Sequence, residues 1–188
     1  YNFGSNVAGE IWWEKRTVAT GEDLMRVGIL TVSDRCFRKE MADESGTLAR
    51  GFFGGKDQVI RYTIVPDERS QIIQALVEMA DALHLDLILA IGGTGLGPRD
   101  VTPEATDVVI DRPIPGIPEY LRRETFHLNQ NSVLSRALSG LRGRTLIVNL
   151  PGHPEAVRQQ LSLLLPLLPH IQEMVEGKVH PSHREVLP

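Results

Sequence analysis

Short apolar, strand-forming runs alternate along this chain with stretches of helical periodicity. The runs are Val27–Val32, Val59–Val65, Leu85–Ile91 and Thr145–Leu150. Strands that alternate with helices of about 10–15 residues are typical of α/β domains, whose sheets are mainly parallel and whose crossovers are right-handed. The alternation therefore predicts an α/β fold with a mainly parallel central sheet.

Apolar residues recur at helical spacing in two of the remaining stretches. The first set is Ile72, Ile73, Leu76, Val77, Ala80 and Leu83, and the second is Val157, Leu161, Leu164, Leu165 and Leu168. Each set predicts a helix that packs one face against the sheet. Because proline has no backbone N–H, Pro166 and Pro169 are expected to kink or split the second helix.

Length and composition fit one globular domain of ordinary size. The chain has 188 residues, 41% of them hydrophobic and 23% charged, and no apolar run approaches the ~18–20 residues of a membrane span. The net charge of −4 provides no basic field for a nucleic-acid backbone. We therefore expect no membrane span and no nucleic-acid partner, and any phosphate binding must be local.

The chain ends and the cysteine content bear on domain boundaries and compartment. Cys36 is the only cysteine, which excludes an intramolecular disulfide and the paired-cysteine zinc patterns. Residues 1–26 have no regular periodicity and lack the basic start and apolar core of a secretory signal. We expect a cytoplasmic protein with an N-terminal extension or linker at 1–26, one domain at 27–178 and a C-terminal tail at 179–188.

A polar cluster follows each of the four predicted strands. The clusters are Ser33–Arg35, Pro66–Glu68, Gly92–Asp100 and Asn149–Gly152. The carboxyl ends of parallel strands share one edge of the sheet, and α/β proteins bind their ligands at that edge. The sequence therefore predicts one pocket to which all four clusters contribute.

The third cluster is rich in glycine, but it matches no generic nucleotide motif. Gly92 and Gly97 have the separation of a P-loop, whereas Pro98 and Arg99 stand where that motif requires Lys and Ser or Thr. The dinucleotide-binding pattern fails as well, because its third glycine would come one residue early. Generic glycine motifs therefore do not identify this loop.

A phosphate-binding role is nevertheless favoured over a simple turn. Glycines between a buried strand and a helix start let backbone N–H groups approach a phosphate closely. Thr102 as N-cap, Pro103 in the first turn and Glu104 near the positive end of the dipole would explain the helix start alone. That reading leaves Arg99 and Asp100 unexplained, since a turn needs neither a cation nor a carboxylate.

Asp67 has two interpretations. Taken alone, the pair Pro66-Asp67 before a helical pattern is more typical of an ordinary N-cap. If Asp67 and Asp100 share one crevice, however, their carboxylates suit Mg²⁺, which prefers carboxylate and phosphate oxygens and keeps several waters. A magnesium site therefore depends on the convergence of the two strand ends.

Several segments together resemble one known family, the molybdopterin adenylyltransferases. They are Thr31–Asp34, Val65–Glu68, Gly92–Gly95, Pro98–Thr106, Leu134–Arg136, Asn149–Gly152 and Leu165–His170. The resemblance extends over about 150 residues in order, and its last block is most similar to the eukaryotic members, including the G domain of gephyrin.

The resemblance implies a fold, an assembly and a reaction. It implies a three-layer α/β/α fold, a homotrimer, and transfer of AMP from Mg-ATP to the terminal phosphate of molybdopterin, giving adenylyl-molybdopterin and pyrophosphate. Mg²⁺ would be the cofactor and ATP a substrate, with possible hand-over of the product to a molybdenum-insertion domain or protein. Because the nucleophile would be the substrate's own phosphate, no serine, cysteine or histidine base is needed, in agreement with a chain that has no recognisable triad.

The same resemblance assigns the site residues. It makes Asp67 and Asp100 the catalytic and metal-binding pair. It implies nucleotide contacts at Gly92, Gly93, Thr94, Gly95, Pro98 and Arg99, and molybdopterin contacts at Ser33, Asp34, Ser135, Arg136, Pro151 and Gly152. One position departs from the family: a small or amide residue usually follows the Pro-Gly pair, and this chain has His153, which by itself is more typical of a solvated loop.

Two other functions remain open from the sequence. One is a non-catalytic pterin-binding or scaffold domain of the same fold, against which the presence of both aspartates argues. The other is a generic nucleotide hydrolase, which the glycine loop would also suit. Pyrophosphate release without a pterin acceptor would favour the hydrolase.

Overall fold

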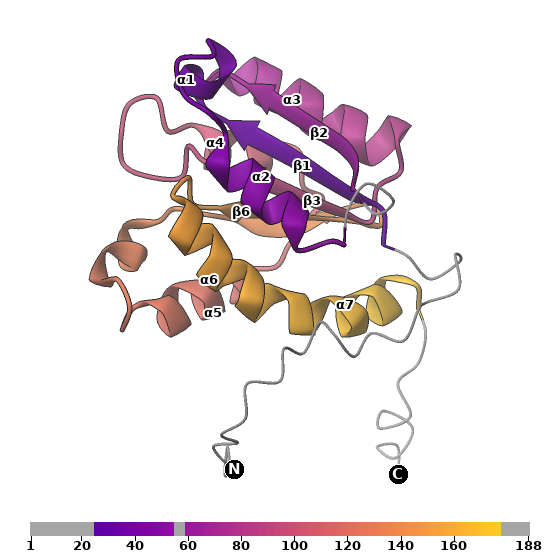
Figure 1. The fold of residues 1–188 in the computed structure, drawn as a ribbon. Helices are drawn as coiled ribbons and strands as arrows, with labels where there is room; N and C mark the ends of the chain where they lie inside the picture. Colours follow the sequence, from indigo (N-terminus) through magenta and orange to yellow (C-terminus); the bar gives the residue numbers. More distant parts are fainter. Residues whose placement is uncertain (1–24, 55–58, 178–188) are drawn as a thin grey trace.

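A computed structural model describes residues 25–54 and 59–177, and this part of the chain contains one sheet of six strands. The strands are β1 (Val27–Val32), β2 (Val59–Val65), β3 (Leu87–Ile91), β4 (Arg112–Pro113), β5 (Ser139–Arg142) and β6 (Thr145–Leu150). Their spatial order is β2-β1-β3-β6-β5-β4 (Figure 1). The predicted α/β fold with a central sheet is thus confirmed.

The direction of the strands determines where the polar clusters meet. β1 pairs in parallel with β2 and β3, and β3 pairs in parallel with β6. β5 runs antiparallel to β6, and β4 runs antiparallel to β5. The carboxyl ends of β1, β2, β3 and β6 therefore share one edge of the sheet, and the segment that leads into β5 reaches the same edge.

Three of the four predicted strands have the predicted bounds, and the third is shorter. β3 begins at Leu87 instead of Leu85. Leu85 is buried, but its carbonyl accepts a hydrogen bond from the Thr145 hydroxyl at 2.6 Å instead of joining a strand ladder. The Asp86 carboxylate accepts from the backbone N–H of Arg26 at 2.7 Å. These contacts connect the chain entering β3 to its neighbours before the parallel ladder starts.

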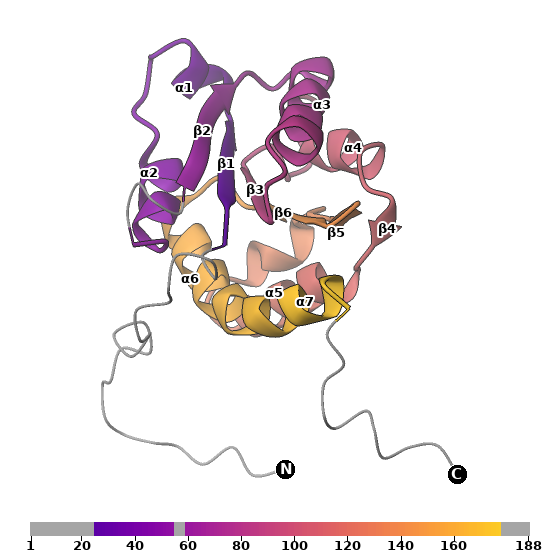
Figure 2. The ribbon, with the colours of Figure 1, turned by 90° about the vertical axis from the view of Figure 1, so that its right-hand side faces the viewer.

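Helices cover both faces of the sheet, as Figures 1 and 2 show. One face carries α2 (Glu44–Gly51), α5 (Gly116–Thr125), α6 (Pro154–Leu164) and α7 (Leu168–Val175), and the other carries α3 (Arg69–Val77), the π-helical turn η2 (Glu78–Ala82) and α4 (Thr102–Asp107). Shorter elements are α1 (Asp34–Phe37) and the 3₁₀ turns η3 (Gln130–Leu134) and η4 (Leu165–Leu167). This is the predicted three-layer arrangement. Among the described residues, no helix has the length and apolarity that crossing a membrane would need.

The two helical predictions are confirmed with a difference at each C-terminal end. The first helix continues from α3 into the π-helical turn η2. The second stops at Leu164, because Pro166 lies in η4 and Pro169 lies in the first turn of α7. A proline ring suits the first turn of a helix, where its missing N–H would have no intrahelical partner.

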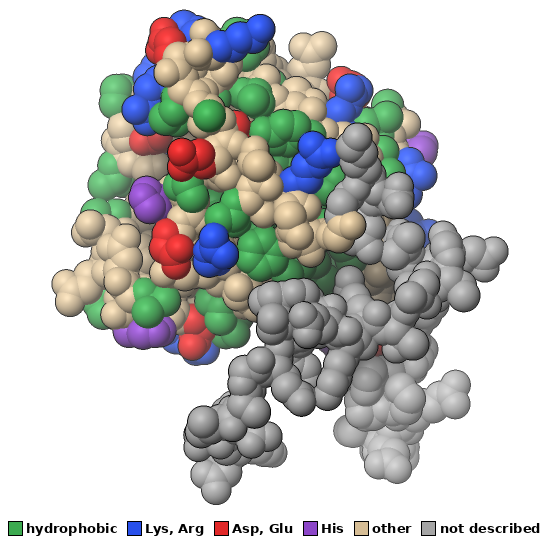
Figure 3. Space-filling view, in the orientation of Figure 1, with side chains coloured by type: hydrophobic (Ala, Val, Ile, Leu, Met, Phe, Trp, Pro, Cys, Tyr) green, Lys and Arg blue, Asp and Glu red, His purple; other side chains and the backbone are tan. Residues whose placement is uncertain are grey.

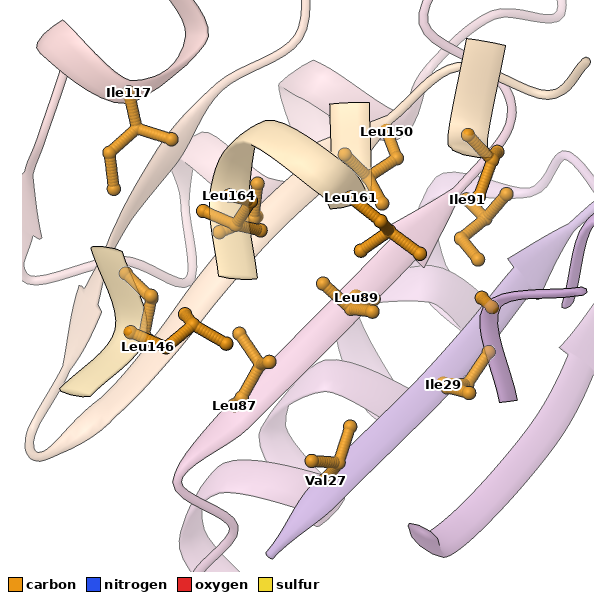
Figure 4. Close-up of a cluster of buried hydrophobic side chains, with 14 of the residues drawn as sticks. Val27, Ile29, Leu87, Leu89, Ile91, Ile117, Leu146, Leu150, Leu161 and Leu164 are labelled. Atoms are coloured by element: carbon orange, nitrogen blue, oxygen red, sulfur yellow. The ribbon is translucent and has the colours of Figure 1, made fainter. Parts of the chain in front are cut away.

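The hydrophobic core lies on both faces of the central strands. β1, β3 and β6 are buried along their whole length, as expected for parallel strands covered on both sides. Figure 4 shows Ile29 and Leu89 of the sheet beside Leu161 of α6. Burying each such side chain stabilises the fold by about 1.5–3 kcal/mol. This packing gives the polar carboxyl edge a rigid base.

Candidate functional site

An open cleft of about 650 Å³ lies at the carboxyl edge of the sheet. Its lining comes from the ends of β1, β2, β3 and β6 and from the segments after them, and it includes Ser33, Asp34, Asp43, Ser45, Asp67, Gly92, Gly93, Asp100, Gly152 and His153. The predicted convergence of the four polar clusters on one pocket is therefore confirmed.

The remaining predicted site residues lie outside this lining. They are Thr94, Gly95, Pro98, Arg99, Ser135, Arg136 and Pro151. Thr94 is buried, whereas Pro98 and Arg99 are exposed. The roles that the resemblance gives to all these residues stay predictions, and their contacts show what each does in the fold.

Asp34 and Asp67 connect the ends of two neighbouring strands. The backbone N–H of Asp34 donates to Asp67 Oδ2 at 2.8 Å, and the backbone N–H of Asp67 donates to Asp34 Oδ1 at 3.1 Å. The N-cap of α3 is Glu68, and its side chain makes no capping bond. The interpretation of Asp67 as the cap of this helix is therefore wrong, because its carboxylate is directed to the start of α1.

Arg99 lies beside this pair and binds two carboxylates. Its guanidinium donates to both oxygens of Asp34, at 3.0 and 3.2 Å, and to Glu68 Oε1 at 2.6 Å. The Arg99 hydrogen bonds hold the pKa of the Asp34 carboxyl below its ordinary value. Half of the Arg99 side chain, 52%, is exposed, so the cation lies at the rim of the cleft within reach of solvent.

Gly92 and Gly93 turn the chain sharply after β3. Both have positive φ angles, +103° and +61°. The Gly92 N–H donates to the Leu150 carbonyl at 3.0 Å, and a Cβ atom on Gly92 would overlap the Val32 carbonyl oxygen. Only glycine therefore fits here, because the backbone passes between the ends of β1 and β6.

Asp100 closes the glycine loop on itself. Its Oδ2 accepts from the Gly97 N–H at 2.7 Å, and its own N–H donates to the Gly97 carbonyl at 3.0 Å. A Cβ atom on Gly95 or Gly97 would approach the same Oδ2 to 2.9 or 2.8 Å. The glycines thus let the loop close around a carboxylate that also lines the cleft.

Arg136 supports this loop from the neighbouring segment. Its side chain donates to the Gly95 carbonyl at 2.7 Å and to the Asp100 carbonyl, and it forms an ion pair with Glu104. Its backbone N–H donates to the Thr94 carbonyl at 2.9 Å. Arg136, which the resemblance assigns to molybdopterin, therefore holds the loop in place through both its main chain and its side chain.

The start of α4 differs from the prediction. The N-cap residue is Val101, not Thr102, and the helix start has no side-chain capping bond. Thr102 is already the first helical residue, and its N–H donates to the Gly93 carbonyl at 3.1 Å. The chain enters the helix one residue early because the glycine loop satisfies this N–H, so the predicted cap is wrong.

Negative charge gathers around Asp67. Burial raises the pKa of Asp67, the Asp34 N–H opposes that effect, and the charges of Asp34 and Asp100 raise the pKa further. No group of three or more histidine, cysteine or acidic side chains suited to a metal occurs among the described residues. Mg²⁺ is commonly bound by one or two carboxylates together with substrate phosphates, so Asp67 and Asp100 suit it chemically.

Sequence reasoning missed the polar cluster around Asp43. Asp43 Oδ2 accepts from the Thr31 hydroxyl and the Tyr62 hydroxyl, both at 2.5 Å, and Oδ1 accepts from the Gly46 N–H at 2.8 Å. Asp43 is the N-cap of α2. The Asp-Glu-Ser-Gly sequence is a recognisable capping signal, but the partners on β1 and β2 are visible only in three dimensions.

The fold is that of an α/β protein with an open cleft at the carboxyl edge of the sheet, the edge at which α/β proteins bind their ligands. The family model described as "probable molybdopterin binding domain" matches residues 28–170. The chain belongs to this family, which confirms the resemblance found in the sequence.

Two curated relatives differ in how much of their length this chain spans. The molybdenum cofactor synthesis protein cinnamon of Drosophila melanogaster is 40% identical over 165 residues, which are 85% of this chain and 27% of that protein. The molybdopterin adenylyltransferase of Helicobacter pylori is 34% identical over 156 residues, which are 81% of this chain and 89% of that protein. The chain thus spans about a quarter of the first relative and most of the second.

A solved structure is similar to this chain in both sequence and fold. The molybdopterin biosynthesis enzyme MoaB from Thermus thermophilus superposes with a TM-score of 0.77 at 47% sequence identity, over 82% of this chain and 98% of that one. The superposition extends over nearly the whole of that protein, so that protein has the same three-layer fold as this chain.

Proposed function

We propose that this protein transfers AMP from Mg-ATP to the terminal phosphate of molybdopterin, as a step of molybdenum cofactor biosynthesis. The observation that carries the proposal is the meeting of Asp67, Asp100 and the Gly92–Gly93 turn in one cleft. The name of the Helicobacter pylori relative, which this chain nearly spans, supports it.

In this reaction the substrates themselves supply the reacting groups. An oxygen of the molybdopterin phosphate attacks the α-phosphorus of ATP, and the bond from that phosphorus to the oxygen bridging to the β-phosphate breaks. Pyrophosphate leaves with the electron pair of that bond. The chain needs no general base, because a phosphate monoester is largely dianionic at neutral pH.

The task of the protein is to bring these anions together. Two unit charges about 4 Å apart repel each other by about 4 kcal/mol at an effective dielectric of 20. Asp67 and Asp100 would hold Mg²⁺, which neutralises phosphate charge when it is bound. Backbone N–H groups of the glycine loop would face the phosphates, and Arg99 at the rim would add a positive charge.

The finer expectations from the sequence belong to the same proposal. Molybdopterin would lie near Ser33, Asp34, Ser135, Arg136, Pro151 and Gly152. The protein would act as a cytoplasmic homotrimer, with one catalytic domain at 27–178 between an N-terminal extension and a C-terminal tail. It would hand its product to a molybdenum-insertion domain or protein, which agrees with the greater length of the Drosophila relative.

The decisive experiment removes one negative charge and keeps the loop. In Asp100→Asn the amide oxygen still accepts from the Gly97 N–H, so the fold of the loop is retained. We expect turnover of ATP with molybdopterin to fall by at least ~10²-fold, the usual effect of losing one electrostatic contact to the transition state. Asp107→Ala, at an exposed carboxylate in α4, is the matched control and should retain full activity.

Product analysis separates this function from its alternatives. Mass spectrometry should find AMP attached to the pterin phosphate, together with one pyrophosphate. Full activity of Asp100→Asn would overturn its assigned role. Tight pterin binding without any turnover would favour the scaffold domain, and pyrophosphate release without pterin would favour a nucleotide hydrolase.

A further inference from the structure

One buried hydroxyl group beside the cleft-lining Gly93 has no hydrogen-bond partner among the described residues. Thr102 is fully buried, and its Oγ1 makes no hydrogen bond within the described part of the chain. Leaving a buried hydroxyl unpaired costs about 1–3 kcal/mol. Such a cost at the entrance to α4, beside the proposed metal site, calls for a compensating role.

Comparable buried hydroxyls in this protein are paired. Thr125 donates to the Leu121 carbonyl at 2.7 Å, Thr145 to the Leu85 carbonyl at 2.6 Å, and Ser139 to the Ile114 carbonyl at 2.7 Å. Thr106, one turn further along α4, accepts from the Asn149 amide at 2.8 Å. Within the described part of the chain, the unpaired Thr102 hydroxyl is therefore an exception.

Asp67 is the polar group that shares the surroundings of this hydroxyl. A Cβ atom on Gly93 would overlap Thr102 Oγ1 and would lie 3.1 Å from Asp67 Oδ1, so both oxygens flank the same bare face of Gly93. Asp67 Oδ2 is already bonded to the Asp34 N–H, and within the described residues no hydrogen bond involves Oδ1. Among the described residues, a donor without an acceptor and an acceptor without a donor thus lie beside the same bare position of Gly93.

We infer that Thr102 is a positioning residue, whose hydroxyl donates to Asp67 Oδ1 when a divalent cation is bound at Asp67 and Asp100. The inference rests on the proposed function only in taking these two aspartates as the cation site. A bound cation keeps the carboxylate ionised, and hydrogen bonds to an ionised acceptor are shorter and stronger than neutral ones. Asp34 would then fix one oxygen of Asp67 and Thr102 the other.

The requirement for glycine at position 93 follows from the same geometry. Any side chain there would displace the Thr102 hydroxyl or separate it from Asp67. Gly93 therefore serves two purposes: its positive φ turns the chain, and its missing Cβ leaves room for both oxygens beside it.

The test uses the full chain, with Mn²⁺ as a spectroscopic probe for Mg²⁺. Thr102→Val replaces the hydroxyl by a methyl group of the same shape, and Thr102→Ser keeps a hydroxyl. Titrations followed by electron paramagnetic resonance give the Mn²⁺ dissociation constant, and urea unfolding without added cation gives stability. Thr106→Val is the matched control, because it removes a buried hydroxyl from the same helix that does have a partner.

The inference predicts opposite changes in the two measurements. Thr102→Val should raise the urea midpoint, because an unpaired buried hydroxyl is lost, and should weaken Mn²⁺ binding by about tenfold, the size of one charge-assisted hydrogen bond. Thr102→Ser should restore most of the affinity. Thr106→Val should lower the midpoint and leave Mn²⁺ affinity unchanged.

Three results would overturn the inference. They are wild-type Mn²⁺ affinity in Thr102→Val, a fall of midpoint and affinity together in that variant, and no Mn²⁺ binding by the wild-type protein. Failure of the proposed function gives a different result: the wild type and its variants would show the expected Mn²⁺ affinities, but the wild type would form no adenylylated pterin.

Discussion

Asp34 and Asp67 each accept a hydrogen bond from the other's backbone N–H, at 3.1 and 2.8 Å. One residue follows β1 and the other follows β2, and these strands pair in parallel along their length. Surface charges on loops usually depend on mobile backbone for their position. Here the proposed metal ligand is fixed by the end of the adjacent strand. On the face of the molecule that Figure 3 shows, acidic and basic side chains are interspersed.

Asp67→Asn should therefore separate charge from structure. The amide oxygen still accepts from the Asp34 N–H, so the free energy of unfolding should change by less than about 0.5 kcal/mol. Adenylyl transfer should fall by about 10²-fold, because the proposed cation site loses one of its two charges. Asp67→Ala should lose the same activity and about 1 kcal/mol of stability, since the Asp34 N–H loses its partner. Wild-type turnover in Asp67→Asn would contradict the proposed metal site.

Gly92→Ala should be among the most destabilising substitutions at a glycine of this fold. The substituted residue would have to keep the positive φ of the backbone here, and its Cβ would overlap the Val32 carbonyl oxygen. We therefore expect urea unfolding to show a loss of about 3 kcal/mol or more in the free energy of unfolding. Gly143→Ala is the control: φ is +55°, but a Cβ there meets no described atom within 4 Å. It should cost about 1–2 kcal/mol, from backbone strain alone. Equal losses in the two variants would contradict the close approach of Gly92 to β1.

Arg136→Gln should loosen the glycine loop without unfolding the protein. The variant loses the guanidinium bonds to the carbonyls of Gly95 and Asp100, so amide hydrogens in residues 94–100 should exchange about tenfold faster. Hydrogen exchange read by mass spectrometry measures this directly. Arg123→Gln is the control, because it removes an arginine whose ion pair, with Glu124 on α5, does not involve the glycine loop. Unchanged exchange of the loop in Arg136→Gln would show that the loop holds itself through Asp100.

Tyr62 provides a pH-dependent prediction. Burial raises the pKa of Tyr62 above its ordinary value, and the hydrogen bond to the Asp43 carboxylate raises it further. A raised pKa favours the neutral phenol in the fold, so this contribution to stability is complete below the unfolded pKa of about 10 and is lost as pH rises through the folded value. In Asp43→Asn the Tyr62 pKa should fall, and an alkaline absorbance titration, with Tyr62→Phe to assign the signal, measures the change. An unchanged titration would mean that burial alone protects the phenol.

The strands and their meeting point could be predicted from the sequence because they depend on local pattern. The apolar runs of β1, β2 and β6 specify buried strands, and parallel strands must end at one edge. Long-range partners could not be predicted. Arg99 binds Asp34 from 65 positions away, and Arg136 binds the Gly95 carbonyl from 41. Sequence spacing contains no information about such pairs.

Local rules failed at Thr102, as they did at Asp67, because a tertiary contact competed with the expected helix cap. Thr102 followed by Pro103 and Glu104 has the composition of a capped helix start, but the Gly93 carbonyl takes the N–H of Thr102 and moves the start of the helix by one residue. β4 and β5 were missed for another reason. They have only two and four residues, too few to show a period.

Because β5 runs antiparallel to β6, it contributes to the carboxyl edge of the sheet in a different way from the parallel strands. A fifth parallel strand could supply this edge only with the residues after it, and it would need another crossover. An antiparallel strand supplies the residues before it, and β5 is joined to β6 by a short hairpin. The segment before β5 thus brings Arg136 to the glycine loop at the carboxyl edge, while the hairpin reverses the chain at the opposite end of β5. The two ends of this short strand therefore have separate roles. The segment before β5 supports the glycine loop, and the far end of β5 joins β6 through a two-residue turn.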